Sequence, residues 1–228
     1  MIALSPCRRI SLPRVVRREQ LFLTAQEVGR LADVIAPFYR PLVYTAAYLG
    51  CRWGELAGLK RENVDLQRRE IRIVGTLQDL GSDVRYVEET KTASSRRNIS
   101  LPAFLAEMIE EHVIVAPASD FMFVRPDGTW LRRTGFRRAE WKPAVAAAGL
   151  DRALRFHDLR HTAAGLLIAQ GAHPKEIQAR LGHASITTTL NTYGHLWPSL
   201  GAQLDAKIEA VFRQARAECG ENVVQQPS

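Results

Sequence analysis

The sequence has few cysteines and lacks any long apolar run. Its three cysteines stand at positions 7, 51 and 219, odd in number and far apart. This spacing provides neither a disulfide framework nor a CxxC metal motif, so we expect a reducing compartment. No stretch approaches the roughly 20 consecutive apolar residues of a membrane-spanning helix. Arginines closely follow residues 1–6, where a signal peptide would continue with apolar residues. These absences favour a soluble cytoplasmic protein.

The composition is that of an ordinary globular protein with an excess of positive charge. The 228 residues are enough for one large domain or two small ones, and 46% of them are hydrophobic. Lysine and arginine outnumber aspartate and glutamate by 31 to 24, which gives a formal net charge of +7. This excess favours a polyanionic partner, although many basic proteins do not bind nucleic acid.

Hydrophobic periodicity predicts a mainly helical α+β fold with a small three-stranded antiparallel sheet. Thr24 and Glu27 have the spacing of a capping box, so a helix should begin there. Alternation of polar and apolar residues predicts strands at 70–74, 84–89 and 97–101, with a turn at 79–83. Further helices are predicted at 41–48, 55–59, 103–115, 136–148, 157–170 and 174–181. An amphipathic C-terminal helix is marked by Leu200, Leu204, Ile208, Val211 and Phe212.

The first 19 residues are strongly basic. They carry arginines at positions 8, 9, 14, 17 and 18, and Glu19 is their single acidic residue. We expect either a linker that lies along a phosphate backbone or a solvated terminus.

Two basic residues in turns, Arg52 and Lys91, are candidates for a functional site. Arg52 lies in the turn Gly50-Cys-Arg-Trp-Gly-Glu-Leu, from which its guanidinium can point into a cleft. The alternative is a surface arginine paired with Glu55. Lys91 lies between two predicted strands, where it can reach a DNA duplex or protonate a leaving group. A solvated basic turn is the alternative for Lys91, and neither segment decides the function alone.

The segment His157-Asp-Leu-Arg160-His161 is the most informative. His157 and Arg160 share one helix face, near an N-terminus whose backbone N–H groups favour an anion. His157 and His161 also have the spacing of a zinc-protease helix, with Asp158 in place of glutamate. The shorter carboxylate, the lack of an evident third ligand and the charge of Arg160 count against zinc. We therefore favour an anion site.

Two later residues complete the pattern. His183 directly follows a predicted helix and precedes hydroxyl residues suited to cap the next one, and Tyr193 closes that run. Alone, His183 is typical of a core histidine and Tyr193 of a packing aromatic. Their order after an arginine, a lysine and a His-x-x-Arg pair favours attack of a phenol on a phosphodiester.

Together these motifs resemble the catalytic domain of the tyrosine recombinase, or phage integrase, family. The resemblance covers residues 20–212. It rests on Leu49-Gly-Cys-Arg52-Trp-Gly-Glu55-Leu, Lys91-Thr-x-x-Ser-x-Arg, His157-Asp-Leu-Arg160-His-Thr, Leu181-Gly-His183 and Thr192-Tyr193-Gly-His. It implies a site-specific recombinase of a phage or mobile element that needs no metal, ATP or other cofactor. The scissile phosphate would be surrounded by Arg52, Lys91, His157, Arg160 and His183, with Tyr193 as the nucleophile.

The resemblance also implies a role for each residue. The two arginines would hold the non-bridging phosphate oxygens with help from His183. His157 would accept the proton of Tyr193, and Lys91 would protonate the departing 5′ oxygen. The product would be a 3′-phosphotyrosyl link, which another 5′-hydroxyl can attack to rejoin strands.

The resemblance divides the chain into three parts. Residues 1–19 would be a basic linker and the remnant of a missing core-binding domain, 20–212 the catalytic domain and 213–228 a flexible tail. The expected partners are double-stranded DNA and further copies of the chain, as a tetramer on DNA. The C-terminal apolar stripe would suit packing on a neighbouring protomer or on its own domain.

Three other functions stay open. They are DNA relaxation of the type IB topoisomerase kind, DNA binding by a non-catalytic remnant and zinc-dependent hydrolysis. The target site, the choice among integration, excision and resolution, and the need for an accessory DNA-bending protein also stay open.

Overall fold

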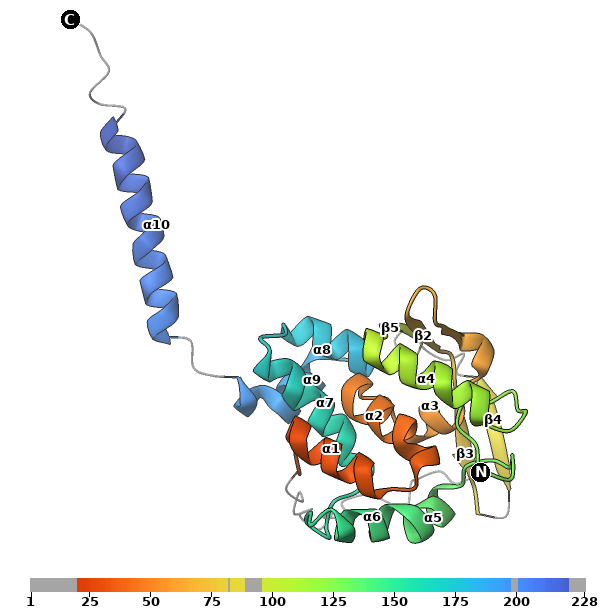
Figure 1. Ribbon diagram of the computed structural model, residues 1–228. Helices are drawn as coiled ribbons and strands as arrows, with labels where there is room; N and C mark the ends of the chain where they lie inside the picture. The colour runs from red at the N-terminus through yellow and green to blue at the C-terminus, as the bar shows by residue number, and fades with distance from the viewer. Residues whose placement is uncertain (1–19, 82, 89–95, 198–200, 222–228) are drawn as a thin grey trace, which may run out of the picture.

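The computed structural model describes residues 20–81, 83–88, 96–197 and 201–221. Helices dominate, and the strands lie along one side of the helical body (Figure 1). The mainly helical α+β class is therefore confirmed. No helix in these described ranges is both long enough and apolar enough to cross a membrane.

Helix α1 (Ala25–Val34) begins where the capping box predicts. The Thr24 side chain accepts a hydrogen bond from the Glu27 amide at 3.2 Å, and the Glu27 carboxylate accepts one from the Thr24 amide at 2.8 Å. Two backbone donors at the start of the helix are thereby satisfied.

Helix α2 (Arg40–Leu49) is central, because it packs against α1, α4 (Ala103–Val115) and α7 (Asp158–Ala169). It ends at Gly50, whose φ of +71° places it in the left-handed region. A Cβ atom at Gly50 would lie 2.4 Å from Leu181 Cδ2 and 3.1 Å from Ala163 Cβ. The end of α2 therefore lies directly against α7 and α8 (Pro174–Leu181).

The strands form two sheets, which corrects the predicted arrangement. Strands β1 (Val64–Asp65), β2 (Glu70–Ile73) and β5 (Arg97–Ser100) make a three-stranded antiparallel sheet. Strands β3 (Gly75–Asp79) and β4 (Val84–Glu88) make a separate hairpin.

The predicted strand at 84–89 thus pairs with residues 75–79, which were not predicted as a strand. The reason is that the chain reverses between Asp79 and Val84, where the Leu80 amide donates to the Asp83 carbonyl at 2.9 Å. This turn pairs the two segments that flank it. It leaves β2 to pair with the more distant β5, in the register Ile71 to Ile99.

The other helices follow the prediction with shifted limits. They are α3 (Trp53–Ala57), α5 (Arg133–Phe136), the π-helical turn η3 (Arg137–Trp141), α6 (Lys142–Ala147), α9 (Ile186–Tyr193) and α10 (Gly201–Glu221). Short 3-10 turns occupy η1 (Pro37–Tyr39), η2 (Arg61–Asn63) and η4 (Gly194–Leu196). The helix predicted at 136–148 is therefore three joined segments. Helix α10 continues to Glu221, while 1–19 and 222–228 lie outside the described residues. The predicted limits of the three parts of the chain stay a prediction.

Candidate active site

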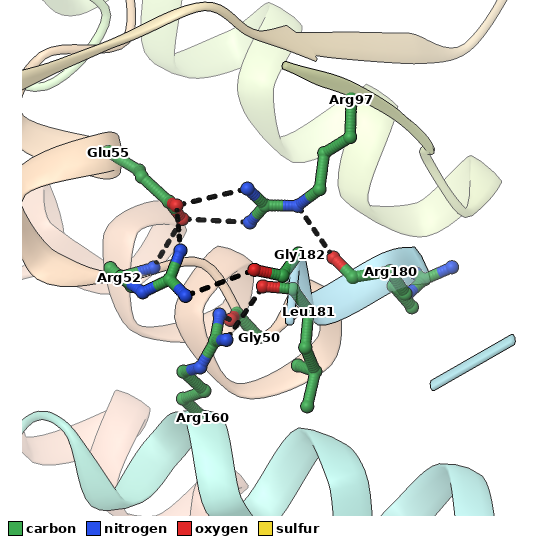
Figure 2. A network of polar contacts seen from close by, with 8 residues as sticks. All are labelled: Gly50, Arg52, Glu55, Arg97, Arg160, Arg180, Leu181 and Gly182. Atoms are coloured by element: carbon green, nitrogen blue, oxygen red, sulfur yellow. Dashed lines mark hydrogen bonds and ion pairs between the residues drawn. The ribbon is translucent and has the colours of Figure 1, made fainter. Parts of the chain in front are cut away.

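A buried carboxylate, Glu55, stands at the centre of an arginine network (Figure 2). Its side chain is 1% exposed and accepts hydrogen bonds from Arg52 and from Arg97. Burial pushes the pKa of Glu55 upward, but the hydrogen bonds and charge of Arg97, followed by the charge of Arg52, outweigh it and hold the pKa at about 2. Glu55 is therefore a carboxylate at any physiological pH.

Arg52 is held by Glu55 and also contacts the opposite side of the site. Its Nη1 lies 2.7 Å from Glu55 Oε1, and its Nη2 donates to the Gly182 carbonyl at 3.2 Å. The side chain is 43% exposed. Arg52 therefore pairs with Glu55, as the alternative expected, and its other amino group faces the backbone just before His183. Its part in a functional site stays a prediction.

Arg160 connects the C-terminal ends of α2 and α8 through hydrogen bonds to their carbonyl groups. It lies on α7 with 3% exposure, and its guanidinium donates to the Gly50 carbonyl at 2.7 Å and the Leu181 carbonyl at 2.6 Å. Burial, followed by the charge of Arg52, lowers the pKa of Arg160 to about 10, so it stays cationic at neutral pH. The two bonds engage two of its five N–H donors.

His183 follows the left-handed Gly182 that ends α8. Its Nδ1 lies 2.8 Å from Thr189 Oγ1, and α9 is capped by Ser185, one of the hydroxyl residues predicted for that purpose. Burial, followed by the charge of Arg160, lowers the pKa of His183 to about 4. The ring is therefore neutral, and when Thr189 donates to Nδ1 the ring proton lies on Nε2.

Tyr193 ends α9 and is 1% exposed, packed in a small apolar cluster with Ile168, Ile177 and Leu181. Its hydroxyl lies 2.9 Å from His161 Nδ1. Burial raises the pKa of Tyr193 to about 12, although the charge of Arg160 opposes that rise.

His161 is neutral, and it is the only described residue that hydrogen-bonds to the Tyr193 hydroxyl. Burial, followed by the nearby His157, lowers the pKa of His161 to about 4. A neutral imidazole can accept the phenol proton at Nδ1. His157 precedes the first turn of α7, with its ring centroid 5.2 Å from that of His161.

The structure thus brings together Arg52, Arg160, His183 and Tyr193. His157 does not contact the tyrosine hydroxyl directly; its ring packs against that of His161, which does. Lys91 lies outside the described residues, so its position stays a prediction. Arg97 and His161 stand in two of the motifs quoted above. Sequence reasoning assigned Arg97 no role of its own and His161 only the role of a zinc ligand. The i, i+4 spacing of His157 and His161 was the signal that could have found a second histidine at the site.

The zinc alternative receives no geometric support from the residues described. No group of three His, Cys, Asp or Glu side chains is arranged to hold a metal ion in those parts of the chain. Nδ1 of His161 is instead engaged by Tyr193.

Solved structures share this fold. The Tn1549 transposon integrase in complex with circular intermediate DNA superimposes with a TM-score of 0.72, at 22% identity over 86% of this chain and 68% of that one. The catalytic domain of bacteriophage HP1 integrase gives a TM-score of 0.56 at 20% identity, covering 84% of this chain and 95% of that domain.

Sequence relatives agree with the fold. The integrase of Mycobacterium phage L5 is 31% identical over 192 residues, which are 81% of this chain and 51% of that protein. The ICEBs1 integrase of Bacillus subtilis is 27% identical over 219 residues, or 90% of this chain and 58% of that protein. The chain therefore spans about half the length of the curated relatives it matches. The model of the phage integrase family matches residues 22–199. The chain belongs to the phage integrase family.

Proposed function

We propose that this chain is the catalytic part of a site-specific DNA recombinase that cleaves and rejoins strands through a 3′-phosphotyrosyl intermediate. The observation that carries the proposal is the convergence of two arginines, a neutral histidine and a buried tyrosine where α2, α8 and α9 end. The net charge of +7 supports DNA as the partner.

The arginines supply the positive charge for a phosphodiester. Arg52 and Arg160 would each donate to a non-bridging oxygen, and such donors are most effective where charge develops in the transition state. His183 would add a donor through Nε2. Because these groups can take the part that metal ions play in other nucleases, we expect cleavage to proceed in the presence of a chelator and without ATP.

Tyr193 needs a proton acceptor, because burial holds the pKa of its phenol near 12. We assign that role to His161, whose Nδ1 already accepts a hydrogen bond at the right distance. The competing assignment is His157, which the family resemblance favours. His157 lies near enough to the same ring to contribute to the phosphate side of the site.

The reaction balances without an outside reagent. The Tyr193 oxygen bonds to phosphorus as its proton passes to the imidazole, and the bond from phosphorus to the 5′ oxygen breaks. Lys91 would give that oxygen its proton. The phosphotyrosyl ester can then be attacked by the 5′-hydroxyl of another strand, which restores the phenol and joins the new partners.

We propose a cytoplasmic protein that acts on double-stranded DNA as a tetramer, with residues 1–19 as a basic linker from a core-binding domain. The family match over residues 22–199 supports a catalytic part within residues 20–212. An accessory DNA-bending protein would be an added partner.

The test is covalent trapping on nicked suicide duplexes taken from the DNA that flanks the gene, with a chelator present. We expect an SDS-resistant adduct with the wild-type chain and none with Tyr193→Phe, while DNA affinity stays within about threefold. Tyr39→Phe is the matched control, because Tyr39 is another buried tyrosine with a pKa near 12, and it should still form the adduct. An adduct with Tyr193→Phe would show that the nucleophile is another residue. A folded wild-type chain that binds this DNA without forming an adduct would favour the non-catalytic alternative.

A further inference from the structure

Arg97, the first residue of β5, has no part in the chemistry proposed above, yet it is built into the same network (Figure 2). Its side chain is only 7% exposed. Nη1 donates to Glu55 Oε1 at 3.0 Å, Nη2 donates to Glu55 Oε2 at 2.8 Å, and Nε donates to the Arg180 carbonyl at 2.8 Å. A buried guanidinium held at three nitrogens has a fixed position, which is what a positioning residue requires.

Glu55 is shared between two arginines, and the sharing is unequal. Arg97 engages both carboxylate oxygens as a fork. Arg52 obtains its backbone amide bond to Oε2 at 2.7 Å but only one side-chain bond, from Nη1 to Oε1. Because the fork occupies Glu55, the second amino group of Arg52 is turned toward the Gly182 carbonyl instead.

Without Arg97, the Glu55 carboxylate would be free to form a bidentate pair with Arg52. A carboxylate that is 1% exposed cannot turn to water for a second partner. The nearest remaining cation is Arg52, and a bidentate pair is the strongest arrangement open to the two groups. The guanidinium of Arg52 would then rotate onto Glu55 and away from the position where a phosphate oxygen needs it.

The second contact of Arg97 reaches the segment that carries His183. Its Nε bond to Arg180 fixes the last turn of α8. A Cβ atom at Gly182 would lie 2.8 Å from Arg97 Nη1 and 3.1 Å from its Cδ, so the backbone just before His183 rests on the guanidinium. One side chain thus holds both the Arg52 side and the His183 side of the site.

We propose that Arg97 is a positioning residue: it saturates Glu55 so that Arg52 stays directed at the DNA phosphate, and it sets the approach of His183. This inference rests on the proposed strand-transfer function.

The first measurement is the single-turnover cleavage rate at saturating suicide DNA. Arg97→Gln should lower this rate on the order of 100-fold, the size expected when a catalytic group is displaced by about an ångström. DNA affinity should stay within about threefold. Arg97→Lys keeps the charge without the fork and should also be slow. The matched control is Arg61→Gln, because Arg61 is a partly buried arginine that bonds to the Pro117 carbonyl at 2.8 Å, and it should cleave at the wild-type rate.

The decisive variant is the double substitution Arg97→Gln with Glu55→Gln. An uncharged residue at position 55 no longer captures Arg52, so the double variant should cleave about tenfold faster than Arg97→Gln alone, although Glu55→Gln alone is slower than wild type. A role in folding alone also predicts recovery in the double variant, because Arg97→Gln leaves a buried charge without its fork and Glu55→Gln removes that charge. The rates are therefore compared under conditions in which urea unfolding shows every variant to be folded. A double variant no faster than Arg97→Gln would overturn the proposal, as would a wild-type rate in Arg97→Gln.

A second readout does not depend on strand transfer. The Nε–Hε NMR signal of Arg52, assigned with Arg52→Lys, should shift in Arg97→Gln and return toward its wild-type position in the double variant. An unmoved signal in folded Arg97→Gln would overturn the positioning role even if no DNA is cleaved. A wild-type chain that fails to form the adduct while these shifts occur would instead count against the proposed function.

Discussion

At the scale of single residues, the reactivity of Tyr193 depends on which histidine accepts the proton of its hydroxyl. Its hydroxyl lies 2.9 Å from His161 Nδ1. We expect His161→Gln to lower the rate of covalent attachment on the order of 100-fold, as losing a general base does. His157→Gln should lower it less. Single-turnover trapping of both variants on one duplex measures the difference, and the reverse order would return the acceptor role to His157.

Two histidines of the site, His161 and His183, should make stability depend on pH. The pKa values of His161 and His183 are about 4 in the folded chain, mainly because burial disfavours the charged ring, against 6.5 for an ordinary histidine. As the pH falls below 6.5, the unfolded chain therefore takes up these protons first. The free energy of unfolding should be fully retained above pH 6.5 and should decrease as the pH falls toward 4.

For His161 the expected loss is about 2 kcal/mol at pH 5 relative to pH 7. Urea unfolding between pH 7 and pH 5 stays above the ordinary pKa of the carboxyl groups, including that of Glu55 in the unfolded chain. His161→Gln should show a smaller decrease than wild type over this interval. Equal decreases in the two proteins would mean that His161 does not have the lowered pKa.

A feature of the site was predictable where it depends on residues close together in the sequence, and not where it depends on contacts between distant segments. The residue types at Arg52, Arg160, His183 and Tyr193 stand in short motifs, so their sequence was enough to select them. The partner of Tyr193 is decided by how α9 packs against α7, across 32 residues of chain. Arg97 begins a predicted strand and closes a quoted motif, but its contact with Glu55 was not predictable, because its burial arises from the pairing of β5 with β2 and from contact with α8.

At the scale of elements, the ends of helices carry the site. The cap of α1 and the limits of α4 and α8 were predictable from local spacing. The pairing of the strands was not predictable from local spacing. The turn between β3 and β4 pairs those two strands with each other, and β2 then pairs with the distant β5. The consequence for function is that Gly50, at the end of α2, both turns the chain and presents its carbonyl to Arg160.

Gly50→Ala should therefore weaken the fold and the site together. Its φ of +71° and a Cβ only 2.4 Å from Leu181 Cδ2 predict a loss of about 2 to 4 kcal/mol in unfolding free energy. The matched control is Gly29→Ala in the middle of α1, where no atom lies within 4 Å of the added Cβ. That substitution should stabilise by about 0.5 to 1 kcal/mol. Urea unfolding of both variants distinguishes the two sites, and similar effects would contradict the close approach at Gly50.

At the scale of the whole molecule, α10 differs from every other long helix. Figure 1 shows it projecting from the rest of the chain, and each described side chain from 205 to 216 is exposed. Its apolar residues Ile208, Val211 and Phe212 are 63% to 69% exposed. Of the two predicted packing modes, these exposures favour a neighbouring protomer over the same domain.

Removing residues 201–228 should consequently leave the fold intact. We expect the melting temperature to change by less than about 3 °C, because no described side chain between 205 and 216 contributes to the core. Complexes that hold several protomers on DNA should be lost, while a single protomer still binds. Analytical ultracentrifugation on a duplex with two sites measures this assembly. The matched variant Val211→Asp with Phe212→Asp keeps the helix length and replaces two of its three exposed apolar residues by charges, so it should behave like the truncation. Full assembly by this variant would show that α10 does not join protomers, and a large fall in melting temperature would show that it packs on its own domain.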